Sequence, residues 1–349
     1  MTTKGMTLSR HLLDEEQRHG LAPGLSTLLL QVGFAAKILA REFTRAALVG
    51  KLGLVGDLNP TGDAQRKLDV FANEAVVTVF AETGLVVGIV SEEMERVRET
   101  ASTSAAKYLL CVDPLDGSSN TDINGALGTI FGIYECNGTG NVSEQALPRC
   151  SEQIAAGYVM YGTSTVLVYT SGHGVYGFTL DRDLGEFLLS HDNIRCPVRG
   201  RYYSANVGRF YEWHSELRAY IEYLTDHDPA NKRPYSLRYS GALVADLHRS
   251  LVEGGIYFYP ADAQHKNGKL RLLYECAPLA FVVEQAGGSA STGVQRILDL
   301  KAESIHQQVP FAIGSAADVA LYEHFFRGLN ITKLPYSARQ NVTVKRDET

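Results

Sequence analysis

The chain has 349 residues, enough to bury a large core, and its composition is that of a globular protein. A net charge of −6 without long runs of like charge argues against nucleic acid as a partner, and no apolar stretch is long enough to span a membrane. Residues 1–20 lack the apolar core of a signal peptide, and the five cysteines have no metal-type spacing, so we expect a cytoplasmic protein with reduced thiols.

Two helices are expected in the first part of the chain. Ser26 or Thr27 can cap an apolar-periodic helix that runs to about Val49, and a second helix is expected over residues 68–83. Between them, residues 50–62 contain four glycines and one proline. This composition predicts a mobile loop that leads into the second helix.

Short apolar runs dominate the sequence as far as residue 190 and predict the strands of one large mixed sheet. They are LVVGIV (85–90), KYLLCV (107–112), GTIFGIY (128–134), AAGYVMYG (155–162), STVLVYT (164–170), VYGFTL (175–180) and EFLLS (186–190). After Cys196-Pro197, helical and strand-like patterns alternate instead. We therefore expect one lobe over 1–196, a second lobe over 197–333 and a polar, disordered tail over 334–349.

The segment 107–120, KYLLCVDPLDGSSN, is the most informative about function. A buried strand breaks into a turn with Asp113 and Asp116, which can converge on one divalent cation, and the Gly-Ser-Ser that follows offers backbone N–H groups of the kind that cradle phosphate. A plain turn is the alternative, because Asp-Pro and Asp-Gly are common turn formers. A calcium loop of the EF-hand type is excluded, since positions 6 and 12 from Asp116 are Thr121 and Leu127.

Further acidic residues fit the same interpretation. Glu92 and Glu93 also follow a predicted strand, and open α/β sheets place ligand sites at the carboxyl ends of strands. Glu275 lies in an apolar segment, 270–283, predicted as a buried helix, where it needs a cation or hydrogen bonds; a structural salt bridge is the alternative. Asp63 and Asp69 lie on the loop and at the start of the second helix, where a capping role is the plain alternative.

Seven motifs occur in one order along the chain and carry a family resemblance. They are VSEE, DPLDGSSN, GTIFGIY, AAGYVMYG, LRYSGALVADLHR, GGIYFYPA and GKLRLLYE. Together they resemble class I fructose-1,6-bisphosphatase, of the lithium-sensitive sugar phosphatase superfamily, from about Leu25 to Phe326. Inositol monophosphatases share DPxDG, but their Trp-Asp-x-Ala-Ala-Gly motif is missing, since the only tryptophan is Trp213 in Glu-Trp-His. Asn120 and the Asn-Gly-Lys-Leu-Arg segment favour the fructose enzyme over sedoheptulose-1,7-bisphosphatase, which stays an alternative.

The resemblance implies an α/β fold of the layered αβαβα sugar-phosphatase type, with two lobes that are each a mixed sheet flanked by helices. It also implies hydrolysis of the 1-phosphate of D-fructose 1,6-bisphosphate in gluconeogenesis or Calvin-type carbohydrate metabolism. The expected assembly is a homo-oligomer, a tetramer in the family, in which Arg238 reaches into the site of a neighbouring subunit.

Phosphate monoester hydrolysis is very slow without a catalyst, so the site must neutralise a dianion and activate water. Two or three Mg²⁺ or Mn²⁺ ions are expected, because hard cations prefer oxygen ligands. The expected ligands are Glu92, Asp113, the Leu115 carbonyl, Asp116 and Glu275. By resemblance, Glu93 with Asp69 takes the proton of the attacking water, and Asp63 closes over the site on its loop.

The substrate contacts also follow from the resemblance. Backbone N–H groups of Gly117, Ser118 and Ser119 are expected at the 1-phosphate, with Arg271 close by. The positions that match the family's 6-phosphate and sugar contacts are Asn206, Tyr239, Tyr259 and Lys269; taken singly, the alternatives are core aromatics and solvated charges. The family's Tyr three residues after the Asn is replaced by Arg209. Since Arg can bind phosphate better than Tyr, tolerance of a 7-phosphate sugar stays open.

Two departures concern regulation by AMP. In AMP-inhibited relatives, Thr and Glu flank a Gly at the start of the first long helix, and Arg follows the GTIFGIY strand. Here these positions hold Pro23, Leu25 and Glu135, whereas Thr27, Lys107 and Tyr108 match. Because Glu135 is negative where the nucleotide phosphate needs positive charge, AMP is expected to inhibit poorly or not at all.

Cys136 and Cys150 flank a polar stretch between two strands. Plastid relatives carry redox-active cysteines in an insertion after the same strand, so a regulatory disulfide is one hypothesis. Two independent reduced thiols are the favoured alternative.

Two other functional classes are alternatives to the enzyme. A catalytically inactive sugar-phosphate sensor predicts loss of at least one acidic position, and a structural protein has no need of a whole carboxylate cluster. All six acidic positions are retained: Asp69, Glu92, Glu93, Asp113, Asp116 and Glu275. The sequence therefore favours the enzyme.

Overall fold

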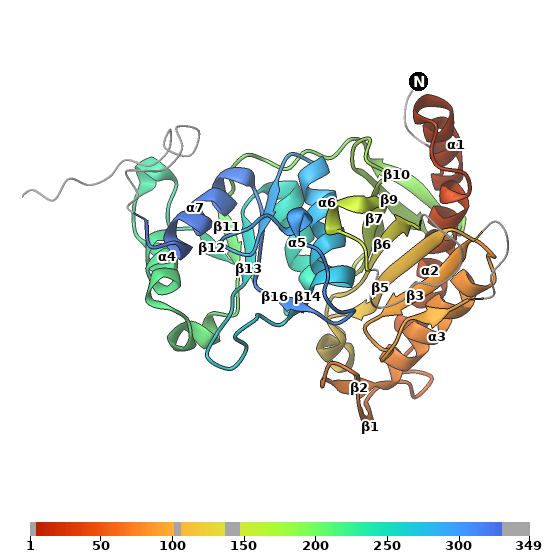
Figure 1. Cartoon of the computed structure of the whole chain (residues 1–349), viewed down its shortest axis with the longest axis horizontal. Helices are drawn as coiled ribbons and strands as arrows, with labels where there is room; N and C mark the ends of the chain where they lie inside the picture. The colour runs from red at the N-terminus through yellow and green to blue at the C-terminus, as the bar shows by residue number, and fades with distance from the viewer. Residues whose placement is uncertain (1–4, 101–105, 137–146, 330–349) are drawn as a thin grey trace, which may run out of the picture.

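The computed structural model describes residues 5–100, 106–136 and 147–329, so the tail expected over 334–349 lies outside the described residues. Two β-sheets alternate with three layers of helices (Figure 1). This arrangement confirms the layered αβαβα fold. Within the described residues, no helix is long and apolar enough to cross a membrane.

The first sheet has eight strands in the order β10-β9-β8-β7-β6-β5-β3-β4. Their bounds are β3 (Val86–Ser91), β4 (Arg98–Glu99), β5 (Tyr108–Asp116), β6 (Leu127–Glu135), β7 (Gln153–Tyr161), β8 (Thr165–Thr170), β9 (Tyr176–Asp181) and β10 (Glu186–His191). Only β3 and β5 run parallel, so the sheet is mixed, as predicted. Side chains alternate between its faces: Leu110 of β5 packs toward the outer helices, and Leu109 packs toward the helices between the sheets.

Three helices cover the outer face of this sheet: α1 (Leu8–His19), α2 (Leu25–Phe43) and α3 (Lys67–Ala81). The helix expected to start after Ser26 or Thr27 is present, but α2 begins earlier, at Leu25, and ends at Phe43 rather than near Val49. Gly24, with φ 89°, precedes α2, and Ser26 lies buried inside it. The helix stops after Phe43, where the Thr44 hydroxyl donates to the carbonyls of Ala40 and Arg41.

Residues 50–62 are not a plain loop. They contribute β1 (Leu54–Leu58), which pairs with β2 (Ala64–Arg66) in a hairpin that projects from the body of the molecule (Figure 1). All five residues of β1 are exposed. Since burial creates the alternating pattern by which a strand is recognised, the sequence carries no such signal here.

The second sheet has the order β12-β11-β13-β17-β15. Its strands are β11 (Tyr202–Ser204), β12 (Ser236–Leu237), β13 (Ile256–Tyr259), β15 (Ser289–Ser291) and β17 (Phe311–Gly314). Helices α5 (Leu243–Glu253) and α6 (Ala277–Gln285) lie between the two sheets, and α4 (Ser215–Thr225) and α7 (Ala316–Phe326) cover the far side (Figure 1). The short strands β14 (Leu270–Arg271) and β16 (Gln308–Val309) pair separately.

The remaining helical segments are short 3₁₀ helices and one π-helical turn: η1 (Ser118–Ile123), η3 (Cys150–Glu152), η4 (Val207–Glu212), η5 (Pro229–Asn231), η6 (Leu272–Cys276) and η7 (Ile297–Asp299). The continuous helix expected over 270–283 is wrong. Strand β14 and the π-helical turn η6 precede α6, whose first turn contains Pro278. Proline lacks an N–H, and a wider turn is one way to accommodate it. Glu275 therefore lies on a π turn.

Candidate active site

A cavity of about 580 Å³ lies where the ends of β3 and β5 face the second sheet. All but one of the site residues predicted from the sequence line it. These are Asp63, Asp69, Glu92, Glu93, Asp113, Leu115, Asp116, Gly117, Ser118, Ser119, Asn206, Tyr239, Tyr259, Lys269, Arg271 and Glu275. Arg238 instead borders a neighbouring depression, where its Nη1 donates to the Leu237 carbonyl at 2.7 Å.

Four buried carboxylates come together because β3 and β5 are parallel neighbours. Glu92 follows β3, Asp113 and Asp116 end β5, and Glu275 reaches the same place from η6. Burial raises the pKa of Glu92 to about 8 and that of Glu275 to about 7, and burial and neighbouring acids raise the pKa of Asp113 well above its usual value. Without a metal ion, the four carboxyl groups therefore cannot all stay ionised easily near neutral pH.

Asp116 also fastens β5 to α5. Its carboxylate accepts hydrogen bonds from the backbone N–H groups of Leu243 at 3.0 Å and Val244 at 2.7 Å. Burial raises the pKa of Asp116 to about 7, although these two N–H groups lower it in part. The next residue must be glycine, because Gly117 has φ 79° and a Cβ there would lie 2.6 Å from the Cβ of Ala242.

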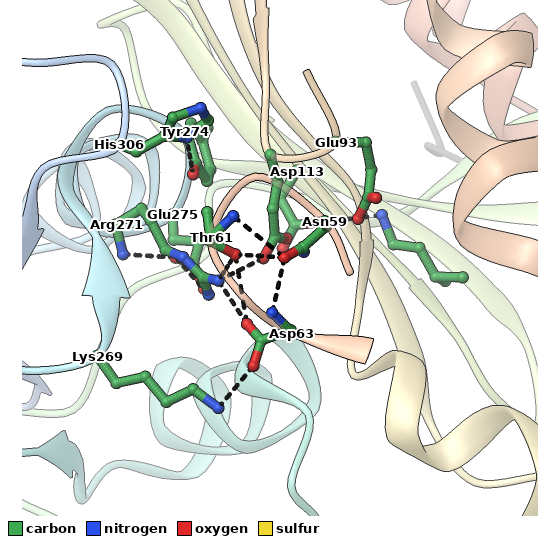
Figure 2. A network of polar contacts seen from close by, with 12 residues as sticks. Asn59, Thr61, Asp63, Glu93, Asp113, Lys269, Arg271, Tyr274, Glu275 and His306 are labelled. Carbon is green, nitrogen blue, oxygen red and sulfur yellow. Dashed lines mark hydrogen bonds and ion pairs between the residues drawn. The ribbon is translucent and has the colours of Figure 1, made fainter. Parts of the chain in front are cut away.

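Arg271 is the cation that contacts Glu92 and Glu275 of this cluster, and Figure 2 shows it beside Glu275 and Asp63. Its Nη2 lies 2.9 Å from Oε1 of Glu92 and 2.6 Å from Oδ2 of Asp63. Its backbone N–H donates to Oε2 of Glu275 at 2.5 Å. Burial alone would lower the pKa of Arg271, but Glu275 and Glu92 raise it above its usual value, so the guanidinium stays charged.

The hairpin delivers Asp63 to this cation through a polar turn that the sequence analysis missed. Oδ1 of Asn59 accepts from the backbone N–H groups of Thr61 and Asp63 at 3.2 and 2.8 Å. Arg271 also donates to the Thr61 hydroxyl, and Nζ of Lys269 lies 3.3 Å from Oδ1 of Asp63 (Figure 2). The signal was the Asn-Pro-Thr-Gly sequence, whose Asn can bond its own backbone two residues on.

Asp69 and Glu93 form a second acidic pair beside the cluster. Oδ2 of Asp69 accepts from the backbone N–H of Arg66 at 2.7 Å, whereas its Oδ1 is buried and has no partner among the described residues. Burial, with Glu93 and Glu92, raises the pKa of Asp69 to about 7. Burial also raises the pKa of Glu93, which accepts from Nε2 of Gln65 at 2.6 Å. Both carboxyl groups therefore hold a proton more readily than an exposed acid does.

The donor set fits hard divalent cations. Seven carboxylates line the cavity against four Lys or Arg residues, and oxygen is the ligand that Mg²⁺ and Mn²⁺ prefer. In the part of the chain that the structure describes, no group of three or more His, Cys, Asp or Glu side chains is arranged to hold a metal ion. Arg271 and the backbone N–H groups engage the carboxylates instead, so binding an ion requires some of these side chains to turn.

The strands of the second sheet and their connections also contribute side chains to the cavity. Asn206, Tyr239 and Tyr259 line it together with Arg209, which was noted only as a departure from the family. Asn120, which favoured the fructose enzyme, has a supporting role: its side-chain amide donates to the carbonyls of Ala126 and Ser240, at 3.1 Å each.

Comparisons with known proteins give one answer. Residues 6–192 match the family model for Fructose-1-6-bisphosphatase, N-terminal domain, and residues 196–327 match that for the C-terminal domain. The chain is 56% identical over 324 residues to class 1 fructose-1,6-bisphosphatase 2 of Acaryochloris marina, covering 91% of this chain and 96% of that protein. The chain belongs to the class I fructose-1,6-bisphosphatase family.

Other relatives agree. A class 1 fructose-1,6-bisphosphatase of Chlorobium chlorochromatii is 48% identical over 93% of this chain and 98% of its own length. The structure is similar to the holo form of Leishmania major fructose-1,6-bisphosphatase, with a TM-score of 0.86 and 37% identity over 92% of this chain and 98% of the other. The family expected from the seven motifs is confirmed.

Proposed function

We propose that this chain is a metal-dependent phosphatase that hydrolyses the 1-phosphate of D-fructose 1,6-bisphosphate, giving fructose 6-phosphate and phosphate. The observation that carries the proposal is the meeting of Glu92, Asp113, Asp116 and Glu275 in a cavity that Arg209, Lys269 and Arg271 also line. Carboxylates that can hold metal ions and basic side chains that can bind phosphate suit a substrate with two phosphates.

In this proposal, two or three Mg²⁺ or Mn²⁺ ions are held by Glu92, Asp113, the Leu115 carbonyl, Asp116 and Glu275. When bound, the ions supply the positive charge that a phosphate dianion needs and lower the pKa of water. The number of ions and the choice of metal are part of the proposal.

The chain's own groups perform the remaining steps. Glu93 and Asp69 take the proton of the attacking water, and their raised pKa values support this role. Backbone N–H groups over 117–119 and the Arg271 guanidinium hold the 1-phosphate. Asp63 fixes the hairpin over the site, and its contacts with Arg271 and Lys269 support this placement.

The proposal also covers the lobe boundary, the assembly and the location of the protein. The lobes meet near residue 196, which is supported by an eight-stranded sheet before that residue and a five-stranded sheet after it. The assembly is a tetramer in which Arg238 serves a neighbouring site, consistent with its position outside its own cavity. The protein acts in the cytoplasm, where its five free cysteines stay reduced.

One observation favours a second substrate. Arg209 has a longer reach than the tyrosine of the family, so a sedoheptulose 1,7-bisphosphate activity is the second candidate. The test is phosphate release from both bisphosphates side by side, with Mg²⁺ and with Mn²⁺. Release from the fructose substrate supports the proposal, and release from the sedoheptulose substrate alone replaces it with the second candidate. Binding without release indicates the inactive sensor.

A further inference from the structure

The carboxylates of the cluster come from two separate parts of the chain. Parallel pairing of β3 with β5 sets the position of Glu92 relative to Asp113 and Asp116. Glu275 lies instead on η6, a turn that belongs to neither of the two large sheets. Strand pairing therefore does not fix the distance from Glu275 to Glu92, and other contacts must do so.

The turn that carries Glu92 and Glu93 is held from two sides at Met94. The backbone N–H of Met94 donates to the Ser91 carbonyl at 3.2 Å, so the two glutamates are the central residues of a four-residue turn. The Met94 carbonyl lies 3.0 Å from Nε2 of His306. Since a carbonyl can only accept, Nε2 carries the hydrogen and donates it. A side chain from the second half of the chain therefore holds this turn in place.

The other ring nitrogen of His306 reaches η6. Its Nδ1 lies 2.8 Å from the Tyr274 hydroxyl, and the two rings meet edge to face (Figure 2). With the hydrogen of the neutral ring on Nε2, Nδ1 accepts and the Tyr274 hydroxyl donates. Tyr274 is fully buried and directly precedes Glu275. Next to this contact, the N–H of Leu272 donates to the Gln307 carbonyl at 2.7 Å. One imidazole thus joins η6 to the turn after β3.

We propose that His306 is a positioning residue that fixes the distance between Glu92 and Glu275. The inference rests on the proposed phosphatase function and extends it to a residue outside the site: of the described residues, those that line the cavity do not include His306, Tyr274 or Met94. Metal–ligand distances tolerate shifts of only about 0.2 Å, and groups that orient the ligands from behind typically change metal affinity about tenfold to a hundredfold. His306 therefore acts on metal binding through the two turns that it joins.

A second pair of the same kind provides a matched control. The Tyr158 hydroxyl on β7 lies 2.8 Å from Nδ1 of His248 on α5, and in both pairs the ring centroids are 5.9 Å apart. Tyr158 is as fully buried as Tyr274. Neither Tyr158 nor His248 is among the described residues that line the cavity. Replacing either tyrosine by phenylalanine removes one hydroxyl from one such pair.

The experiment is calorimetric titration of the full chain with Mn²⁺ alone, without substrate. His306→Phe keeps a ring but neither nitrogen, and it should weaken Mn²⁺ binding about tenfold to a hundredfold. Tyr274→Phe should cause a smaller loss, and His306→Gln, whose amide can still donate to Met94, should retain part of the affinity. Adding Tyr274→Phe to His306→Phe should cause no further loss, because Tyr274 acts through His306. Tyr158→Phe should leave Mn²⁺ binding unchanged.

Thermal unfolding of each variant establishes that it is folded; should His306→Phe not fold, Tyr274→Phe decides by the same criteria. Unchanged Mn²⁺ binding in the decisive variant, or an equal loss in Tyr158→Phe, would overturn the positioning role. Phosphate release from fructose 1,6-bisphosphate is measured beside the titration. A wild-type protein that binds Mn²⁺ but releases no phosphate refutes the phosphatase proposal alone, because the titration still decides the role of His306. A wild-type protein that binds no Mn²⁺ refutes both.

Discussion

The cavity and the junction between α2 and the start of β5 both bring charged groups together from distant parts of the chain, but with different results. In the cavity, four buried carboxylates lie together beside Arg271, and burial raises the pKa of each of them. At the junction, Nζ of Lys107 pairs with Oε1 of Glu135 at 2.5 Å, and the Tyr108 hydroxyl donates to the Pro23 carbonyl at 2.7 Å. At the junction, Lys107, Glu135 and Tyr108 therefore have partners within the chain.

This difference distinguishes a site whose charged groups are available to a ligand from one whose polar groups are already paired with each other. Burying several carboxylates together is costly unless a ligand or metal uses them, so the presence of this cluster in the cavity supports a function there. Lys107 and Tyr108 match the family's AMP contacts, yet both already have partners within the chain. A nucleotide would have to displace these partners before it could bind.

The largest effect is expected from the cluster. Asp116→Ala should lower kcat by about a thousandfold or more, because it removes a charge from the proposed metal site. It also removes the anchor of α5, so Glu92→Gln, which keeps the side-chain size, should be measured beside it. Asp318→Asn is the matched control, since Asp318 is equally buried but lies at α7 among Gly200 and Tyr235. Near-native kcat in the two site variants would contradict the metal assignment.

Replacing Arg271 tests how far the buried acids of the cavity depend on its positive charge. Arg271→Gln should destabilise the metal-free protein by roughly 3 kcal/mol, because it leaves buried acids without their cation. The pKa values of Glu275 and Glu92 are raised to about 7 and 8, so they bind protons in the folded state that the unfolded chain has released. The free energy of unfolding of the metal-free protein therefore falls as pH rises from about 5 toward 8. The further loss of free energy caused by Arg271→Gln should be larger at pH 8 than at pH 6.

Chemical denaturation in the presence of a chelator measures this loss. Arg296→Gln is the control, because Arg296 pairs with Glu284 at 2.6 Å but its side chain is 49% exposed. That variant should lose less than about 1 kcal/mol. Equal losses in the two variants would mean that the acids around Arg271 are already neutral.

The junction gives the third prediction. AMP at micromolar concentrations should leave activity nearly unchanged, because Glu135 neutralises Lys107 and repels the nucleotide phosphate. Glu135→Arg should lower the AMP concentration needed for half-inhibition, by about tenfold or more, and Glu135→Gln should have a smaller effect. Half-inhibition of the wild-type protein at micromolar AMP would show that Thr27, Lys107 and Tyr108 are sufficient.

The sequence predicted the parts of the cavity that depend on strand order. Glu92, Asp113 and Asp116 each follow an apolar run, and parallel pairing of β3 and β5 brings such residues together. Lys269 and Arg271 were expected only through the family resemblance, because no periodic pattern links residues 269–271 to β5.

Helix α1 and the turn at Asn59 were not predicted, because neither shows a clear apolar pattern in the sequence. The buried face of α1 includes His11 and Glu15 beside Leu8 and Leu12, which blurs the apolar period. The turn at Asn59 is held by side-chain bonds to its own backbone and buries little apolar surface, so hydrophobic pattern could not reveal it.

The smallest effect is expected at the two cysteines next to the junction. Both are free in the structure, and the segment 137–146 between them lies outside the described residues. Burial raises the pKa of Cys150 to about 12, and burial with the nearby Glu135 also raises the pKa of Cys136. Because the thiolate is the reactive form, both thiols should oxidise slowly.

Activity should therefore be the same with and without dithiothreitol, and mass spectrometry of the 136–150 peptide after mild oxidation should show two thiols. A disulfide would close a short loop and stabilise the oxidised form by about 3 kcal/mol in the chain-entropy model. Cys136 directly follows β6, the strand that pairs with β5 along the length that ends in Asp113 and Asp116. A rate that falls on oxidation, together with the linked peptide, would show that strain at this end of β6 reaches the carboxylates. The junction would then regulate the cavity by a route other than AMP.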